Sequence, residues 1–234
     1  MSTIRDLSIN ILAAIAIFLF GWSWRRATLL LRSRRARAFW EVSSGVDSKI
    51  VMGRHAGFRD YEPAGLTGVG DVIAMSTLIT FFANSGIKPP SVLYSDPPNG
   101  DELTGNLIVL GDADMNKVAK LIDERGETAI EAIGIKFQDK LSGRLFEPHM
   151  NAQKTSGVDV GVIIKTVNPY SSGSYVFILA GSYGYGTRAA ATLATSSDFL
   201  SLVKSRWSTC ECVFSVDVVN DVPQQPKILL LRSS

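Results

Sequence analysis

Glycines stand at three places where an apolar stretch typical of a buried strand leads into a segment typical of a helix. A glycine lets backbone approach a ligand closely, and a helix N-terminus presents unpaired N–H groups and partial positive charge. Together these features suit a phosphate group. The candidate ligand-binding residues at the three places are Gly53, Arg54, Gly68, Gly70, Asp71, Gly111, Asp112, Asn116, Gly181, Ser182, Gly184, Gly186, Thr187 and Arg188.

The third of these places carries the clearest pattern. Gly184 and Gly186 lie between an apolar stretch and a helix-like segment, and Arg188 is placed to add a charge-assisted contact to an anion. This pattern predicts phosphate or nucleotide binding. The alternative interpretation is a tight turn in which the glycines serve only backbone geometry and helix packing.

The second place differs because it is acidic. Asp112 and Asp114 precede or open a predicted helix together with Asn116. Carboxylates there cap the helix and repel phosphate, but they suit a ribose hydroxyl, a base edge or a metal ion. Helix capping alone is the other interpretation. If the three loops follow parallel strands, they meet at one sheet edge, which is the usual ligand position in open α/β sheets.

Residue types for other chemistries are scarce. His55 and His149 are the only histidines, and two cysteines are too few for a zinc site. Cys210 and Cys212 alternate on a predicted strand, so we interpret them as core thiols. The sequence has no H-E-x-x-H motif and no P-loop lysine motif. It also has no G-x-S-x-G elbow, which disfavours a triad hydrolase. We therefore expect no metal and no cofactor, and we assign no catalytic residue.

Residues 174–190 (SYVFILAGSYGYGTRAA) resemble the glycine signature of the Lonely-Guy/DprA-like Rossmann proteins. In that family an apolar strand runs into a P-G-G-x-G-T-x-x-E loop that holds nucleotide phosphate. Gly184, Gly186 and Thr187 match the G-x-G-T part, whereas the Pro-Gly-Gly start is replaced and Ala190 stands at the glutamate position. The resemblance implies a Rossmann-like fold and nucleotide binding, without the glutamate linked to phosphoribohydrolase activity.

The N-terminal residues differ from the rest in charge and hydropathy. Residues 1–37 carry a net charge of +6 and the remaining chain −4, so a general nucleic-acid-binding surface is not expected. Residues 7–24 hold no charge, which predicts a transmembrane helix. Arginines follow it, which predicts a cytoplasmic C-terminal side, and the same charge order argues against a cleaved signal peptide. The arginines expected to contact anionic lipid headgroups are Arg25, Arg26, Arg32, Arg34, Arg35 and Arg37.

The rest of the chain alternates short apolar stretches with helix-like segments. Strands are expected at 49–53, 91–95, 106–111, 158–167, 175–181, 209–219 and 227–231, and helices at 72–86, 112–126 and 188–205 with a break near Ser196. This succession predicts an α/β fold, a Rossmann-like three-layer domain with a mixed, mostly parallel sheet. The stretches 158–167 and 175–181 are too close for a crossover helix, so they predict an antiparallel hairpin. Residues 127–157 give no clear pattern.

These elements give four expected regions. Residues 1–6 form a short extracytoplasmic N-terminus, 7–24 the membrane helix, 25–47 an arginine-rich juxtamembrane stalk and 48–234 the cytosolic domain. The plan is similar to that of bacterial membrane-anchored defence effectors. It predicts a single-pass protein of the cell membrane, with its N-terminus outside.

The function expected from this plan is a homo-oligomeric sensor or binding module for a nucleotide or related phosphorylated ligand. One alternative is a membrane-tethered nucleotide or NAD hydrolase that uses Asp71, Asp112 or Asp114. Another is a scaffold without a ligand.

Overall fold

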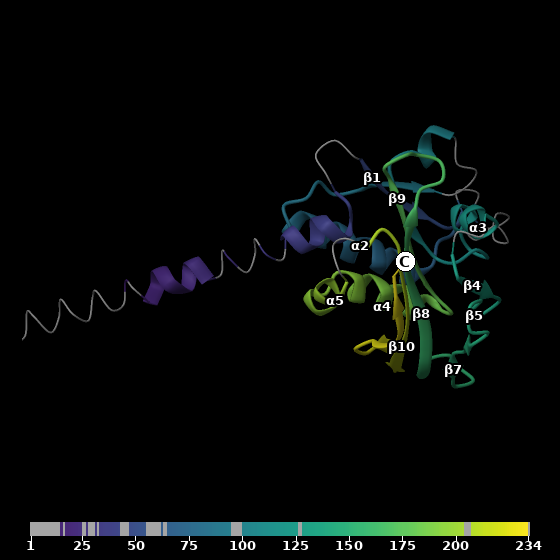
Figure 1. Cartoon of the computed structure of the whole chain (residues 1–234). Coiled ribbons are helices and arrows are strands. Elements are labelled where there is room, and N and C mark those ends of the chain that lie inside the picture. The colour runs from purple at the N-terminus through teal and green to yellow at the C-terminus, as the bar shows by residue number, and fades with distance from the viewer. Residues whose placement is uncertain are drawn as a thin grey trace, which may run out of the picture.

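The computed structural model describes residues 15, 17–24, 27, 31, 33–42, 47–54, 62, 65–94, 100–125, 128–203 and 207–233. They form an α/β fold in which one large mixed sheet is covered on both faces (Figure 1). The α/β class and the mixed sheet predicted from the sequence are confirmed. The prediction that the sheet is mostly parallel is wrong, because antiparallel pairs outnumber parallel ones among its described strands.

Four strands of the large sheet are parallel. β1 (Ser48–Met52), β2 (Ser91–Tyr94), β3 (Asn106–Leu110) and β9 (Tyr175–Gly181) lie in the order β2-β1-β3-β9. β3 is buried along its whole length, which explains its continuous apolar sequence. The chain leaves β1 toward β2 on one side and returns to β3 on the other, so the strand order reverses between β1 and β3.

The other half of the large sheet is antiparallel. β8 (Gly157–Val167) pairs with β9, which confirms the predicted hairpin, and β10 (Cys210–Val219) pairs with β8. Two short strands, β7 (His149–Met150) and β11 (Val222–Pro223), extend these pairs. β12 (Lys227–Arg232) borders β10, and the register between them shifts at Val213/Phe214. This shift is a β-bulge near the end of the sheet.

One face of the large sheet is covered by helices. α2 (Val69–Asn84), α4 (Gly184–Ala194) and the short α5 (Ser197–Leu202) pack there (Figure 1). Ser196 separates α4 from α5 because its hydroxyl accepts a hydrogen bond from the Phe199 N–H at 3.1 Å, which confirms the predicted break.

Residues 33–39 are also helical and join this layer. Trp40, which follows them, is 1% exposed, and its ring lies 4.9 Å from that of Phe177 on β9. Ala36 and Phe39 are buried in the same core. The end of the segment that was expected to be a stalk is therefore part of the folded body.

The opposite face of the large sheet is covered in part by residues between 127 and 157, for which the sequence showed no clear pattern. α3 (Lys117–Asp123) lies there with a three-stranded sheet of β4 (Ile130–Ile133), β5 (Lys136–Asp139) and β6 (Leu145–Phe146). A 3₁₀ turn, η2 (Gly100–Leu103), precedes β3. Ile130, Phe137 and Phe146 are buried against the large sheet, so each short strand contributes one buried apolar side chain.

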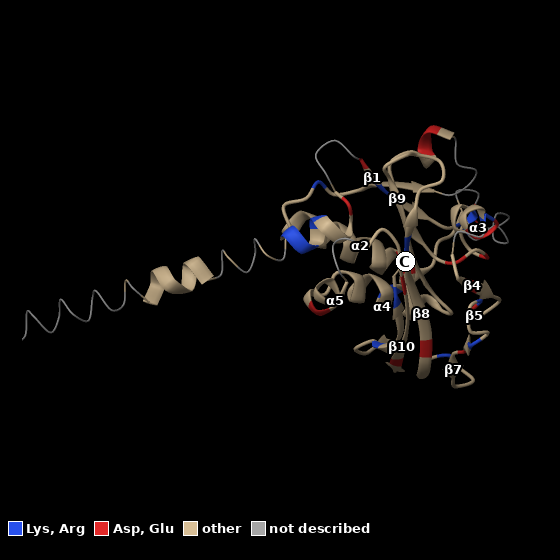
Figure 2. Cartoon of the chain, viewed as in Figure 1, with Lys and Arg blue, Asp and Glu red and all other residues tan. Residues whose placement is uncertain are grey.

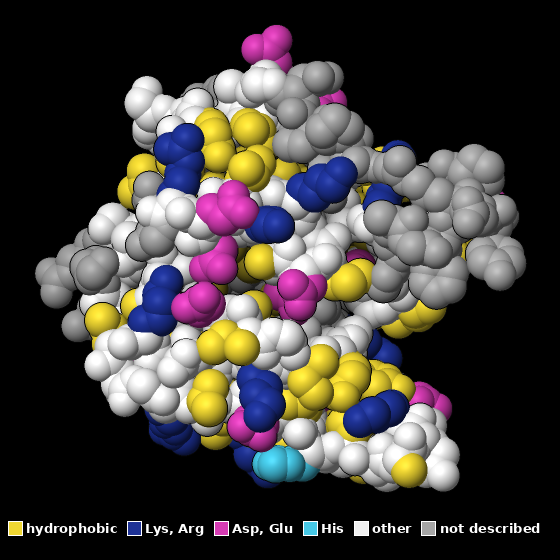
Figure 3. Space-filling model, turned by 90° about the vertical axis from the view of Figure 1, so that its right-hand side faces the viewer, with side chains coloured by type: hydrophobic (Ala, Val, Ile, Leu, Met, Phe, Trp, Pro, Cys, Tyr) yellow, Lys and Arg dark blue, Asp and Glu magenta, His cyan; other side chains and the backbone are white. Residues whose placement is uncertain are grey.

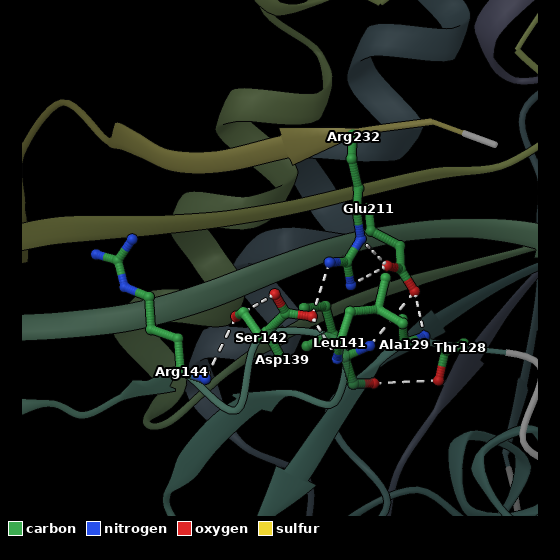
Figure 4. Close-up of polar contacts among 9 residues, drawn as sticks. Thr128, Ala129, Asp139, Leu141, Ser142, Arg144, Glu211 and Arg232 are labelled. Carbon is green, nitrogen blue, oxygen red and sulfur yellow. Dashed lines mark hydrogen bonds and ion pairs between the residues drawn. The ribbon is translucent and has the colours of Figure 1, made fainter.

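An arginine on β12 ties the small sheet to the large one (Figure 4). The Arg232 guanidinium contacts Asp139 Oδ1 on β5 at 2.7 Å and Glu211 Oε2 on β10 at 2.6 Å. Glu211 also accepts a hydrogen bond from the Ala129 N–H, just before β4, at 2.6 Å. The Asp139 side chain is only 3% exposed, so this contact neutralises a buried charge.

The predicted transmembrane helix over residues 7–24 is wrong. In the parts of the chain that the structure describes, no helix is both long enough and apolar enough to cross a membrane. Spanning a bilayer takes about 20 helical residues, and those described within this run are 15 and 17–24. Residues 7–14 and 16 of the predicted span lie outside the described residues.

The localisation predicted from that helix is corrected with it, as is the fold class that included a transmembrane helix. The structure does not support a single-pass protein of the cell membrane with its N-terminus outside. Of the arginines expected to contact lipid, Arg25, Arg26 and Arg32 lie outside the described residues. Arg37 instead donates a hydrogen bond to the carbonyl of Gly86, just after α2, at 2.6 Å.

We predict that Arg232→Met destabilises the protein by about 3 kcal/mol, because it leaves two largely buried carboxylates without their cation. Urea unfolding followed by circular dichroism measures this free energy. The control is Lys227→Met, since Lys227 pairs with Asp217 at the surface, where both side chains are substantially exposed. That substitution should cost less than about 1 kcal/mol. Equal losses in the two variants would contradict the role given to Arg232.

Candidate functional site

The three glycine-containing loops lie at one edge of the sheet. β1, β3 and β9 are parallel neighbours, and the registers Met52↔Leu110 and Leu110↔Leu179 bring their carboxyl ends level. The loops that follow these strands therefore adjoin one another, as the sequence pattern predicted. We call this region the glycine edge. It includes the reversal of strand order between β1 and β3, where open α/β sheets commonly bind ligands.

The N-termini of α2 and α4 touch at this edge. A Cβ on Gly70, in the first turn of α2, would lie 2.1 Å from the carbonyl oxygen of Gly184, at the start of α4. The two helices therefore meet through backbone alone. Their N-cap residues, Gly68 and Tyr183, form no side-chain capping hydrogen bond. Two helix ends with positive partial charge are thus brought side by side.

Glycines also press the start of α4 onto the sheet. A Cβ on Gly181 would lie 2.4 Å from Cα of Gly186, and one on Gly186 would lie 2.6 Å from Cα of Gly181. Both positions are filled by the chain itself. These two predicted ligand-binding residues therefore position the loop through packing, and Thr187 beside them is buried with 3% exposure.

A carboxylate that was not predicted holds the same turn from inside the protein. Asp159 on β8 is fully buried, and its Oδ2 accepts a hydrogen bond from the Gly186 N–H at 2.6 Å. Its Oδ1 accepts one from the Val160 N–H at 2.8 Å. Burial raises the pKa of Asp159 to about 7, although these N–H groups and that of Tyr183 oppose the rise. The only sequence signal was an acid within the apolar stretch 158–167.

The loop after β1 is tied to the glycine edge by several contacts. Thr67 Oγ1 donates to the carbonyl of Gly53 at 3.0 Å, and Gly53 packs so closely on Met115 that a Cβ would lie 2.4 Å from its carbonyl oxygen. Asp71 is buried in the first turn of α2, and its N–H donates to the carbonyl of Gly68 at 3.1 Å. This loop is therefore held against both β1 and the loop after β3.

Arg54 lies beside Tyr94 at the carboxyl end of β2. Its guanidinium carbon is 4.6 Å from the centre of the Tyr94 ring, a cation–π distance. Arg54 Nε is buried and has no hydrogen-bond partner among the described residues. A buried donor without a partner costs free energy, so this nitrogen is one of the groups at this edge whose hydrogen bond the described residues do not account for.

The loop after β3 has its polar groups largely engaged. Asn116 Nδ2 donates to the carbonyls of Val51 and Leu110, each at 3.0 Å, and Oδ1 accepts from the Val118 N–H. Asn116 therefore joins β1 to β3 and caps α3. Gly111 adopts φ +90°, a conformation that favours glycine.

Asp112 is the main acidic group of the loop after β3. Its Oδ1 accepts hydrogen bonds from the N–H groups of Asp114 and Met115. Burial raises the pKa of Asp112, and the charge of Asp114 raises it further. A carboxyl group with a raised pKa suits proton transfer or a hydrogen bond to a ligand hydroxyl.

Ser182 and Arg188 are the two remaining candidate residues after β9, and they lie in different surroundings. Ser182 Oγ is buried without a hydrogen-bond partner in the described part of the chain, while the Ser182 N–H donates to the Val160 carbonyl at 2.8 Å. Arg188 lies in the second turn of α4, and no hydrogen bond or ion pair joins its side chain to the described residues. His55 lies outside those residues.

Other sites that the sequence raised can be placed as well. Cys210 and Cys212 are buried in the core, as predicted, and burial raises the pKa of Cys210 to about 12. Within the described ranges no group of three or more His, Cys, Asp or Glu side chains is placed to hold a metal ion.

Charged side chains are distributed over the body without one dominant field. Figure 2 shows blue and red positions scattered over the elements, with basic residues on the helical segment before β1. On the side covered by α3 and the small sheet, acidic and basic side chains alternate with hydrophobic ones (Figure 3). Charges of both signs are therefore interspersed on the described part of this side, and neither sign forms a continuous patch in this view.

A separate cavity of about 240 Å³ lies beside the Arg232 contacts. Its lining includes Ile164, Thr166, Thr209, Glu211 and Arg232. Thr166 lies near the end of β8 that pairs with the start of β9, so the cavity is at the opposite edge of the sheet. Arg232 is already neutralised there by two carboxylates, and the cavity offers no free charge of that residue to an anion.

No protein-family model matches the chain, and no curated protein matches it. The resemblance of residues 174–190 to the Lonely-Guy/DprA-like signature therefore stays a prediction.

We predict that Gly70→Ala lowers the free energy of unfolding by at least about 2 kcal/mol, because the new methyl group would overlap the backbone of Gly184. Thermal and urea unfolding measure the loss. Gly100→Ala is the matched control, since a Cβ there meets nothing within 4 Å. If Gly70→Ala were as stable as Gly100→Ala, the backbone contact between α2 and α4 would be refuted.

Proposed function

We propose that this protein binds a nucleotide or a related phosphorylated small molecule at the glycine edge. The observation that carries the proposal is the contact between the N-termini of two helices whose own N-cap side chains form no hydrogen bond, beside buried donors that have no described partner. These features are the Gly70–Gly184 contact, Ser182 Oγ and Arg54 Nε. Unpaired N–H groups at a helix N-terminus bind anions, and α2 adds its own donors to those of α4 that Asp159 does not occupy.

The spacing of the donors favours a ligand longer than a phosphate ion. Arg54 follows β1 and Ser182 follows β9, with β3 between them. Neighbouring strands are about 4.8 Å apart, so these two loops begin roughly 10 Å from each other. A nucleotide is long enough to contact both, with its phosphate at the helix ends and its base or sugar toward Arg54.

The acidic groups of the glycine edge restrict the ligand further. Asp71 lies in the first turn of α2, and Asp112 lies on the loop after β3. Carboxylates repel additional phosphate charge but accept hydrogen bonds from sugar hydroxyls. We therefore favour a ligand that combines one or two phosphate groups with a ribose over a polyphosphate. The expected homo-oligomer remains part of the proposal, and light scattering with and without nucleotide tests whether binding changes it.

A hydrolase acting on a nucleotide or NAD is the second candidate. The raised pKa of Asp112 favours it, because burial makes this carboxyl group a better proton acceptor than an ordinary aspartate. Product formation from NAD or nucleoside monophosphates, lost in Asp112→Asn, would support this candidate.

A ligand-free scaffold is the third candidate. Bulky glycine substitutions do not test it, because Gly70, Gly181 and Gly186 are needed for packing. Ser182 is the better probe, since its hydroxyl has no described partner to lose.

We predict that Ser182→Ala and Arg54→Gln each weaken nucleotide binding about tenfold, the effect of losing one hydrogen bond to a charged group. Isothermal titration of the full chain with AMP, ADP, NAD and a cyclic dinucleotide measures the affinity. Ser201→Ala on α5 is the control for Ser182→Ala, because that hydroxyl bonds only locally to the Asp198 carbonyl. It should bind as the unaltered protein does. Absence of heat with every nucleotide would overturn the proposed function.

A further inference from the structure

Asp159 occupies a special position with respect to the glycine edge. Its carboxylate lies beneath the first turn of α4 and binds the N–H of Gly186 at 2.6 Å. Gly186 in turn packs on Gly181, so the carboxylate, the turn and the end of β9 form one rigid unit. The outer N–H groups of the same turn, those of Gly184 and Tyr185, belong to the helix end proposed to meet the ligand.

The surroundings of Asp159 give it no cation. It belongs to none of the ion pairs found among the described residues, and Val216 stands opposite it on β10. The titratable and charged side chains of the elements around it have other partners or are exposed. Tyr185 bonds to Asp221 at 2.5 Å and also feels the charge of Asp159. Lys154 lies over the Tyr183 ring, Asp217 pairs with Lys227, and His149 on β7 is exposed.

We propose that Asp159 positions the first-turn amides of α4 for an anionic ligand and takes up a proton when that ligand binds. This inference rests on the proposed function. The proton comes from solvent and is accepted by the carboxylate, so no other reactant is needed. One oxygen of the neutral carboxyl group still accepts the Gly186 hydrogen bond.

Ligand binding and protonation of Asp159 are coupled because the ligand and the Asp159 carboxylate would place two negative charges at the same helix end. An anion at the outer amides and the Asp159 carboxylate would both lie within a single helical turn, about 5.4 Å long. The interior between them has a low dielectric, so their repulsion is strong. Protonating Asp159 removes that repulsion. The pKa of about 7 in the free protein means that this proton is exchanged in the physiological range.

Linkage fixes the direction of the effect. Ligand binding raises the pKa of Asp159, so affinity is highest when Asp159 is protonated and falls as pH rises through about 7. A purely structural cap would behave differently. It would leave the affinity independent of pH, although its removal would still destabilise α4.

Sulfate is a suitable probe because its charge does not change between pH 5.5 and 8.5. We expect its affinity for the full chain, followed by the amide shifts of Gly184 and Tyr185 in nuclear magnetic resonance, to fall about tenfold over that range. Asp159→Asn should abolish most of this dependence. Asp221→Asn, which alters an exposed acid bound to Tyr185, should retain it.

Proton uptake is measured independently by titrating the unaltered protein with sulfate calorimetrically in two buffers of different ionisation enthalpy. We expect uptake of a substantial fraction of one proton per sulfate near pH 7.5. This measurement stands even if Asp159→Asn does not fold. Sulfate binding without proton uptake and without pH dependence would overturn the role of Asp159 alone. Failure of both sulfate and nucleotides to bind would overturn the proposed function, and this inference with it.

Discussion

The close approach of backbone segments at the glycine edge is the constraint on which the rest of the structure depends. Gly70 meets Gly184 between the two helices, and Gly181 meets Gly186 between strand and helix, at separations that a side chain would occupy. These contacts fix the start of α4 relative to both α2 and the sheet. They also bring two helix N-termini side by side, so the packing of the core and the chemistry of the candidate site have the same origin.

The sequence predicted much of the fold because its signals were local. Apolar stretches predicted most strands of the large sheet, and the short connector before β9 predicted its hairpin with β8. The small sheet was missed because β4 to β6 are only two to four residues long, which is too short to show a strand periodicity. The membrane helix was wrongly predicted because an apolar run does not itself establish a continuous helix of sufficient length.

The candidate site was predicted in outline but not in its roles. Parallel strands explain why the three loops meet, and this could be deduced from the sequence. The roles depend on tertiary contacts. Asn116 joins two strands, and Gly181 and Gly186 allow two backbone segments to touch. Asp159 contacts the turn from β8, an antiparallel strand that carries none of the three glycine-containing loops. No periodicity or spacing in the sequence shows such contacts, because they join residues far apart in the chain.

The bulge between β10 and β12 has a consequence for assembly. β12 is a border strand rich in leucine, and such a strand with regular spacing would invite a second chain to continue the sheet. The register shift at Val213/Phe214 interrupts the even sequence of hydrogen-bonding groups and increases the local twist. A border strand interrupted in this way is a poorer template for a further strand than a regular one.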